Sequence, residues 1–219
     1  MSIKAGVHEV VAVIGCQKMT ELSTAEILAL MGRVGEVQWE SVFGTTFPGY
    51  YAMFAKRHMH EFGTTREQLL EVAVKNHHYG AMNPNALFRK EITSEKAAAS
   101  DDVATPFHVY DCCANADGAA CVILASEGRA REISKKPVWL DGMGCATASM
   151  SVLRRPSLVG LPSAEQAAST AYEMAGVGPA DVKVADVHDC FTIAEIMAYE
   201  DLGFCKKGQG GPMVAERQT

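Results

Sequence analysis

The sequence lacks the features that identify several large classes of protein. No apolar run approaches the ~20 residues that a membrane-spanning helix needs. The formal net charge is −6, so nothing favours binding to nucleic acid or to an anionic membrane surface. The N-terminus also lacks the pattern of a signal peptide, because Glu9 precedes the apolar run and no small-residue cleavage site follows. We therefore expect a cytoplasmic protein that neither crosses a membrane nor binds nucleic acid.

No pair of cysteines has the Cys-x-x-Cys spacing that is typical of structural zinc. The seven cysteines lie mostly in apolar surroundings: Cys16, Cys112, Cys113, Cys121, Cys145, Cys190 and Cys205. Free thiols in a reducing compartment are their simplest explanation. Two histidines, His58 and His60, fall in an expected helix, where a spacing of two points them to different sides. They are poor ligands for one ion, and we expect no metal site.

The chain does contain enough apolar sequence for a sizeable core, since 48% of its 219 residues are apolar and 21% are charged. Short apolar runs that suit buried strands alternate with helical patterns, which favours an α/β fold. Strands are expected at residues 9–15, 107–113, 118–126, 137–142 and 182–187. Helices are expected at residues 24–31, 52–62, 64–77, 127–134, 163–176 and from 192 until the glycine at 203. Residues 44–51, rich in Gly, Pro and aromatics, favour a loop.

Three of these helices begin with a capping-box pattern: Thr65 with Gln68, Ser163 with Gln166, and Thr192 with Glu195. In the helix at 64–77, the polar Asn76 follows the same face as Leu69, Val72 and Ala73. In the helix after residue 192, Ile193, Ile196 and Met197 share one face, which we expect to be buried.

The tetrapeptide His188-Asp189-Cys190-Phe191 lies where the expected strand at 182–187 ends and the next helix begins. Ligands collect at such an edge of an open α/β sheet, because helix N-termini and their unpaired N–H groups meet there. An imidazole at this turn can donate a hydrogen bond to a developing oxyanion, or act as an acid or base near neutral pH. The alternative is that His188 hydrogen-bonds its own loop and holds the turn. The pattern by itself leaves both interpretations open.

Four stretches that together span nearly the whole chain resemble the thiolase family, in its sterol-carrier-protein-type and archaeal branch. They are AGVHEVVAVIGCQKMT (5–20), the segment 45–84 that begins TTFPGYY, DCCANADGAACVILASE (111–127) and VHDCFTIAEIMAYEDLGFC (187–205). The resemblance implies the thiolase fold, an α/β architecture of two similar halves in five αβαβα layers, with helices on both faces of mostly parallel sheets. Residues 1–133 then correspond to the end of the N-terminal half, with an inserted loop region at about 20–106, and residues 134–219 to the start of the C-terminal half.

Thiolases are acyltransferases of lipid metabolism that use coenzyme A. The resemblance therefore implies condensation of two acyl-CoA molecules, or thiolytic cleavage of a 3-oxoacyl-CoA, with no permanently bound cofactor. In this branch the histidine of His-Asp-Cys-Phe helps to bind the thioester oxygen in an oxyanion hole, which implies that catalytic role for His188. Phe191 matches an aromatic residue beside the acyl-pantetheine path, and Asp189 and Cys190 support the turn.

The sequence departs from the family pattern at its catalytic motifs. The family's nucleophilic cysteine precedes the stretch matched by the first residues here, and its Gly-His-Pro and Cys-x-Gly motifs follow the stretch matched by the last. Gly-His-Pro occurs nowhere in the 219 residues. We therefore expect a truncated, central part of a thiolase, incomplete at both ends. We expect no activity from it alone, because acyl transfer needs a thiolate activated by a nearby base.

Two other functions remain open beside a thiolase that forms a homodimer or homotetramer in its complete form. The chain can be a non-catalytic subunit or acyl-CoA-binding module, completed by a partner such as the small zinc-ribbon/OB-fold proteins with which relatives of this branch associate. It can also resemble the thiolase-like aldolases of the same branch, which cleave lipid or steroid side chains.

Overall fold

The computed structural model describes residues 2–219 and divides them into two compact units. The first, here called the ribbon unit, comprises the chain up to residue 24 and residues 115–141. The second, the helical unit, comprises residues 25–114 and 142–219. This division follows contacts within the chain, and the family's division into halves at about residue 133 stays a prediction.

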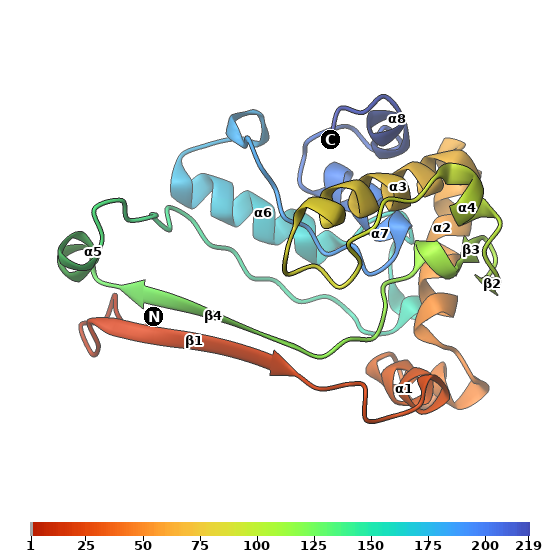
Figure 1. The fold of residues 1–219 in the computed structure, drawn as a ribbon, viewed down its shortest axis with the longest axis horizontal. Helices are drawn as coiled ribbons and strands as arrows, with labels where there is room; N and C mark the ends of the chain where they lie inside the picture. The colour runs from red at the N-terminus through yellow and green to blue at the C-terminus, as the bar shows by residue number, and fades with distance from the viewer. Residues whose placement is uncertain (1) are drawn as a thin grey trace. The chain divides into compact units, whose positions relative to one another are not determined.

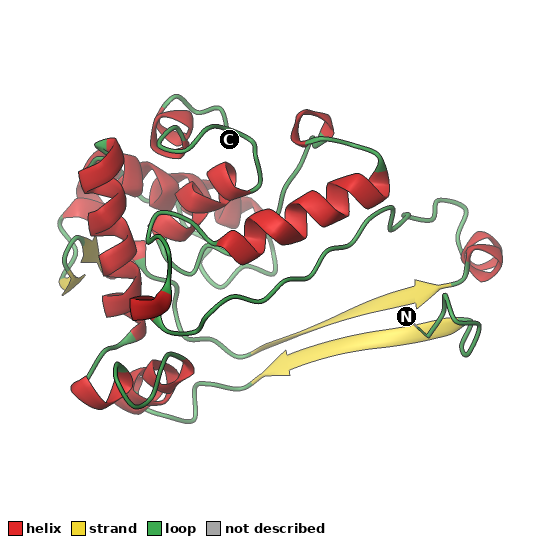
Figure 2. Ribbon diagram, turned by 180° about the vertical axis from the view of Figure 1, so that it is seen from behind, coloured by secondary structure: helices red, strands yellow, loops and turns green. Residues whose placement is uncertain are grey.

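The ribbon unit is built on two long antiparallel strands, β1 (Val10–Gln17) and β4 (Gly118–Ala125), which Figure 2 shows as opposed yellow arrows. Val10 lies opposite Ala125 and Gln17 lies opposite Gly118. Helix α5 (Glu127–Ile133) follows β4 directly. The strands predicted at 9–15 and 118–126 are thus confirmed as strands. Their expected burial is wrong, because nearly all residues of β1 and β4 are exposed in this structure.

The helical unit holds the other elements (Figure 1). Its helices are α1 (Thr24–Met31), which starts at the border of the unit, α2 (Phe47–Phe62), α3 (Arg66–Met82), α4 (Ser94–Ala98), α6 (Pro162–Ala175), α7 (Thr192–Asp201) and α8 (Gly210–Ala215). Two short antiparallel strands, β2 (Asp102–Ala104) and β3 (Phe107–His108), form its one sheet among the described residues. Single turns of 3-10 helix lie at Gly32–Val34, Ser41–Phe43, Val109–Asp111, Val152–Arg154 and Pro179–Asp181.

Helix α7 is the centre of the helical unit, where it packs against α2, α3, α6 and α8. Ile193, Ile196 and Met197 are fully buried, as their shared face predicts. Nine of the ten residues of α7 are buried, including four polar ones: Thr192, Glu195, Glu200 and Asp201. Since a buried polar group without a partner is costly, each of these four needs one.

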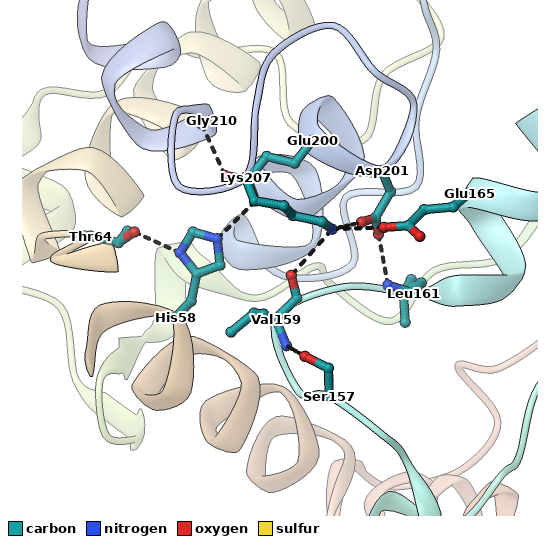
Figure 3. Close-up of polar contacts among 10 residues, drawn as sticks. All are labelled: His58, Thr64, Ser157, Val159, Leu161, Glu165, Glu200, Asp201, Lys207 and Gly210. Atoms are coloured by element: carbon teal, nitrogen blue, oxygen red, sulfur yellow. Dashed lines mark hydrogen bonds and ion pairs between the residues drawn. The ribbon is translucent and has the colours of Figure 1, made fainter. Parts of the chain in front are cut away.

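All four polar side chains of α7 have partners outside the helix. The Thr192 hydroxyl donates to Asp111 at 2.9 Å, and Asp111 also accepts two hydrogen bonds from Arg66. Glu195 is paired with Lys75. Figure 3 shows the other two: Glu200 contacts the His58 ring and Asp201 is paired with Lys207.

Sequence predictions succeed where local chemistry decides the structure. Helix α1 spans the predicted residues 24–31, and the Thr65–Gln68 capping box is present at the start of α3. The capping boxes predicted at Ser163 and Thr192 are wrong. The N-cap residues of α6 and α7 are Leu161 and Phe191, and neither side chain makes a capping hydrogen bond. The loop expected at 44–51 is wrong in its second half, since Thr46 caps α2 and Pro48 sits in its first turn.

The strands predicted at 137–142 and 182–187 are also wrong. Both segments run as loop in Figure 2, with Val138 and Val184 almost fully exposed. A strand requires a neighbour to satisfy its backbone groups, and neither segment pairs with any described residue. For the same reason, the mostly parallel sheets are not found among residues 2–219, where both sheets are antiparallel pairs.

Replacing Phe107 with Ala is expected to lower the free energy of unfolding by about 3–5 kcal/mol, because this fully buried ring leaves a cavity in the core. Phe43→Ala is the matched control, since the Phe43 side chain is 76% exposed and should change stability by less than about 0.5 kcal/mol. Urea denaturation measures both. Equal losses in the two variants would contradict this description of the core.

The buried His58 is expected to stabilise the fold through its two hydrogen bonds, to the Thr64 hydroxyl at 2.6 Å and to the Glu200 carboxylate at 3.1 Å. His58→Ala leaves that carboxylate with less compensation for its burial and should cost about 3 kcal/mol. His60 is exposed on the same helix, and His60→Ala should be neutral. Neither replacement should change the metal content, and a metal lost with His58 would contradict this interpretation.

Candidate functional site

The turn 188–191 is fixed where it joins α7. Phe191 is the N-cap residue, in an extended conformation with φ −141° and ψ 151°. It forms an isolated antiparallel bridge with Cys112, and the Cys113 N–H donates to the Cys190 carbonyl at 3.0 Å. The turn is therefore held by backbone contacts with residues 112–113.

His188 is exposed at this turn, and its ring makes no hydrogen bond among residues 2–219. The interpretation that the imidazole holds its own loop therefore has no support in this structure. A ring with both nitrogens accessible can donate a hydrogen bond to a bound group.

Phe191 lies in the core of the unit and is 5% exposed. Its ring stacks on Tyr51, with 4.7 Å between ring centroids, and on Phe107, at 5.4 Å. These contacts order the first turn of α7. A place beside an acyl-pantetheine path stays a prediction.

Cys190 is buried, and desolvation raises the pKa of its thiol to about 11. Burial likewise raises the pKa of the nearby Cys112 thiol to about 12, and raises that of Cys113. Nucleophilic cysteines need the opposite shift, because the thiolate is the reactive form. Cys190 is thus arranged as a packing residue of the turn.

Asp189 belongs to a polar cluster between the turn, α3 and α7. The Asn76 side-chain amide donates to the Asp189 carboxylate at 2.7 Å and to the Glu195 carboxylate at 2.6 Å. Glu195 also accepts hydrogen bonds from Lys75 and Tyr199, which are themselves joined by a 2.8 Å hydrogen bond. We call these five residues, 75, 76, 189, 195 and 199, the Asn76 cluster.

Burial, and then the neighbouring Glu195 carboxylate, raise the pKa of Asp189 above its ordinary value. The residue as a whole is exposed, but its carboxylate lies in the cluster. A backbone hydrogen bond at Asp189, then the charge of His188 and then that of Lys75, lower this pKa and offset part of the rise.

A cavity of about 920 Å³ adjoins the Asn76 cluster. All five cluster residues line it, together with the extended segment 182–187. Of the turn, only Asp189 is among the lining residues. His188 and Phe191 therefore face other surroundings than this cavity.

Within residues 2–219, no group of three or more His, Cys, Asp or Glu side chains is arranged to hold a metal ion. The described helices include none with the length and apolarity to cross a bilayer. All seven cysteines are free thiols.

Sequence reasoning placed Asp189 as a supporting residue and missed Lys75, Asn76 and Tyr199. One signal was present, because Asn76 shares a helix face with three apolar residues. A polar residue on an apolar face needs a buried partner, but the sequence does not say which one.

Comparison with known proteins places this chain in a family. A family model described as Thiolase C-terminal domain-like matches residues 144–219. An acetyl-CoA acetyltransferase from Methanothermobacter thermautotrophicus is 39% identical over 219 residues, covering 100% of this chain and 57% of that protein. The benzoylsuccinyl-CoA thiolase subunit BbsB of Thauera aromatica is 38% identical over 95% of this chain and 53% of that protein.

Among solved structures, an Ltp2-ChsH2(DUF35) aldolase matches with a TM-score of 0.85 and 28% identity, over 98% of this chain and 57% of the other. The chain belongs to the thiolase family and has a thiolase-like α/β fold. It spans little more than half the length of the curated relatives that it matches.

The raised pKa of Asp189 predicts a pH dependence of stability. The folded state holds this proton more tightly than the unfolded chain, so ionisation of Asp189 lowers stability as the pH rises above the ordinary value of about 4. Asp189→Asn removes the charge and keeps an oxygen that accepts from Asn76. The variant should therefore gain stability relative to the wild type between about pH 4 and pH 7.

Urea denaturation at the two pH values measures this difference. Asp101→Asn, at an exposed carboxylate outside the cluster, is the control and should show no such gain. An Asp189→Asn variant that loses stability relative to the wild type over this interval would contradict the assignment.

Proposed function

We propose that the chain functions in a thiolase-type acyltransferase, in which it contributes His188 to the oxyanion hole for an acyl-CoA thioester. The observation that carries the proposal is the exposed, unbonded imidazole of His188 on an anchored turn at the start of α7. The similarity to an acetyl-CoA acetyltransferase extends over the whole chain, including this turn. Acyl-CoA and coenzyme A are substrates in this proposal, and no cofactor is held permanently.

The imidazole N–H donates to the thioester oxygen as negative charge develops there. Such a donor accelerates reaction because it is already oriented before the charge appears. The backbone bridge at Phe191 and the hydrogen bond from Asn76 to Asp189 hold the stretch of chain that follows His188. The two reactions served are condensation of acyl-CoA molecules and thiolysis of a 3-oxoacyl-CoA.

We propose that groups outside these 219 residues carry out the covalent step. The sequence has no Gly-His-Pro, and burial disfavours the thiolate forms of Cys112, Cys113 and Cys190. The nucleophile and the proton-transfer groups have to come from further sequence of the same protein or from another chain. We therefore expect no turnover from these 219 residues alone.

An aldolase is the second candidate, because the match to the Ltp2-ChsH2(DUF35) aldolase covers 98% of this chain. A third candidate is a non-catalytic subunit or acyl-CoA-binding module. The Thauera relative is named as a thiolase subunit, which supports assembly with another chain. We also propose that the complete protein acts in lipid metabolism in the cytoplasm. It would form a homodimer or homotetramer and bind a zinc-ribbon/OB-fold protein as a further partner.

His188→Ala in the complete protein is expected to lower kcat/KM for acyl-CoA by about 10²- to 10³-fold, the effect of losing one oxyanion donor. Steady-state kinetics with acetyl-CoA measure it. His60→Ala, at an exposed histidine on α2, is the matched control and should leave kcat/KM unchanged. Equal kcat/KM values for His188→Ala and the wild type would refute the oxyanion role.

A further inference from the structure

Among the described residues, one side-chain hydrogen bond joins α3 to the His188 turn, and Asn76 makes it. Its Nδ2 group donates one hydrogen bond to Asp189 and one to Glu195, so both amide hydrogens are used. An ionised carboxylate could not replace the Asn76 amide, because at neutral pH it accepts hydrogen bonds and donates none. The contact joins positions 113 residues apart in the sequence.

The Glu195 end of this bridge is rigid. Glu195 is buried on α7 and is held by Lys75 and Tyr199 as well as by Asn76. Lys75 is the neighbour of Asn76 on α3, so both ends of the cluster are attached to packed helices. Asn76 therefore links Asp189, which lies outside the helices, to two packed helices and limits where its side chain can lie.

The backbone of α7 does not depend on this contact. Leu69 and Val72 on α3 are buried in the same core as Ile193 and Ile196 on α7, and they keep the two helices together. Loss of the Asn76 hydrogen bonds should thus leave the helices in place and release the turn. A variant that releases the turn while the helices stay packed would therefore distinguish a positioning role of Asn76 from a purely structural one.

We propose that Asn76 is a positioning residue, which fixes the Asp189 carboxylate and through it the orientation of the adjacent His188 imidazole. This inference rests on the proposed function, because it gives the orientation of His188 a catalytic purpose. It extends that function to a residue on α3, within the inserted loop region predicted at about 20–106.

The test uses Asn76→Asp in the complete protein, which keeps the size of the side chain and removes both donors. The first measurement is the NMR signals of the His188 ring nitrogens, which do not depend on turnover. They should shift in Asn76→Asp and stay unchanged in Asn85→Asp, the same replacement at an exposed asparagine outside the cluster. Unchanged His188 signals in Asn76→Asp would overturn the proposal.

The double variant Asn76→Asp/Asp189→Asn is the rescue. It restores one donor and one acceptor between positions 76 and 189 in reversed order and keeps the wild-type charge. The new carboxylate at position 76 still faces Glu195, so the expected rescue is partial. The His188 signals should return toward their wild-type positions. A double variant no closer to the wild type than Asn76→Asp would show that the hydrogen bond to Asp189 is not the cause. If Asn76→Asp fails to fold, Asn76→Ser takes its place, with the same expected shift.

Kinetics separate this inference from the proposed function. Asn76→Asp should lower kcat by about tenfold through misorientation, with KM little changed. In a His188→Ala background the same replacement should have no further effect, because the group that it positions is gone. An additional loss in that background would overturn the positioning role. No effect of His188→Ala itself would refute the proposed function, and the NMR shifts would then decide the role of Asn76 alone.

Discussion

The burial of α7 is the constraint on which the helical unit depends. A helix enclosed by α2, α3, α6 and α8 can carry polar side chains only if each finds a partner inside the protein. Thr192, Glu195, Glu200 and Asp201 all do so, and their partners include Asp111, Lys75, His58 and Lys207. These contacts fix the helix in rotation and in register, which apolar packing alone specifies less sharply. The precise placement of the His188 turn at its N-terminus follows from this.

The turn thus combines an anchored backbone with an accessible side chain. Phe191 and Cys190 are buried and resemble core residues, while His188, three residues before the N-cap residue Phe191, is exposed. Such a division suits the role proposed for His188, in which an accessible side chain meets a bound group while the backbone that carries it stays in place. It also explains why the tetrapeptide mixes an apolar ring and a buried thiol with two ionisable side chains.

The sequence predicted the parts of the fold that neighbouring residues determine. Helix α1, the capping box of α3 and the strands β1 and β4 follow from local patterns. Thr192 was misassigned as a cap because its hydroxyl is used by Asp111, 81 residues away. The segment 182–187 has the composition of a strand but no neighbour to pair with among the described residues. Likewise the pattern identified His188 and Asp189, whereas the hydrogen bond from Asn76 depends on how α3 and α7 pack.

The pairing of His58 with Glu200 carries a consequence for how the chain reaches its native state. These two residues are 142 positions apart, and Asn76 and Glu195 are 119 apart. Such contacts form only after long loops have closed. They therefore contribute to stability late in folding and favour slow, cooperative folding. A protease cut between the two regions, for example in the exposed stretch near residue 138, would turn one folding event into an association of two pieces. The integrity of the intervening chain is therefore itself part of what stabilises α7.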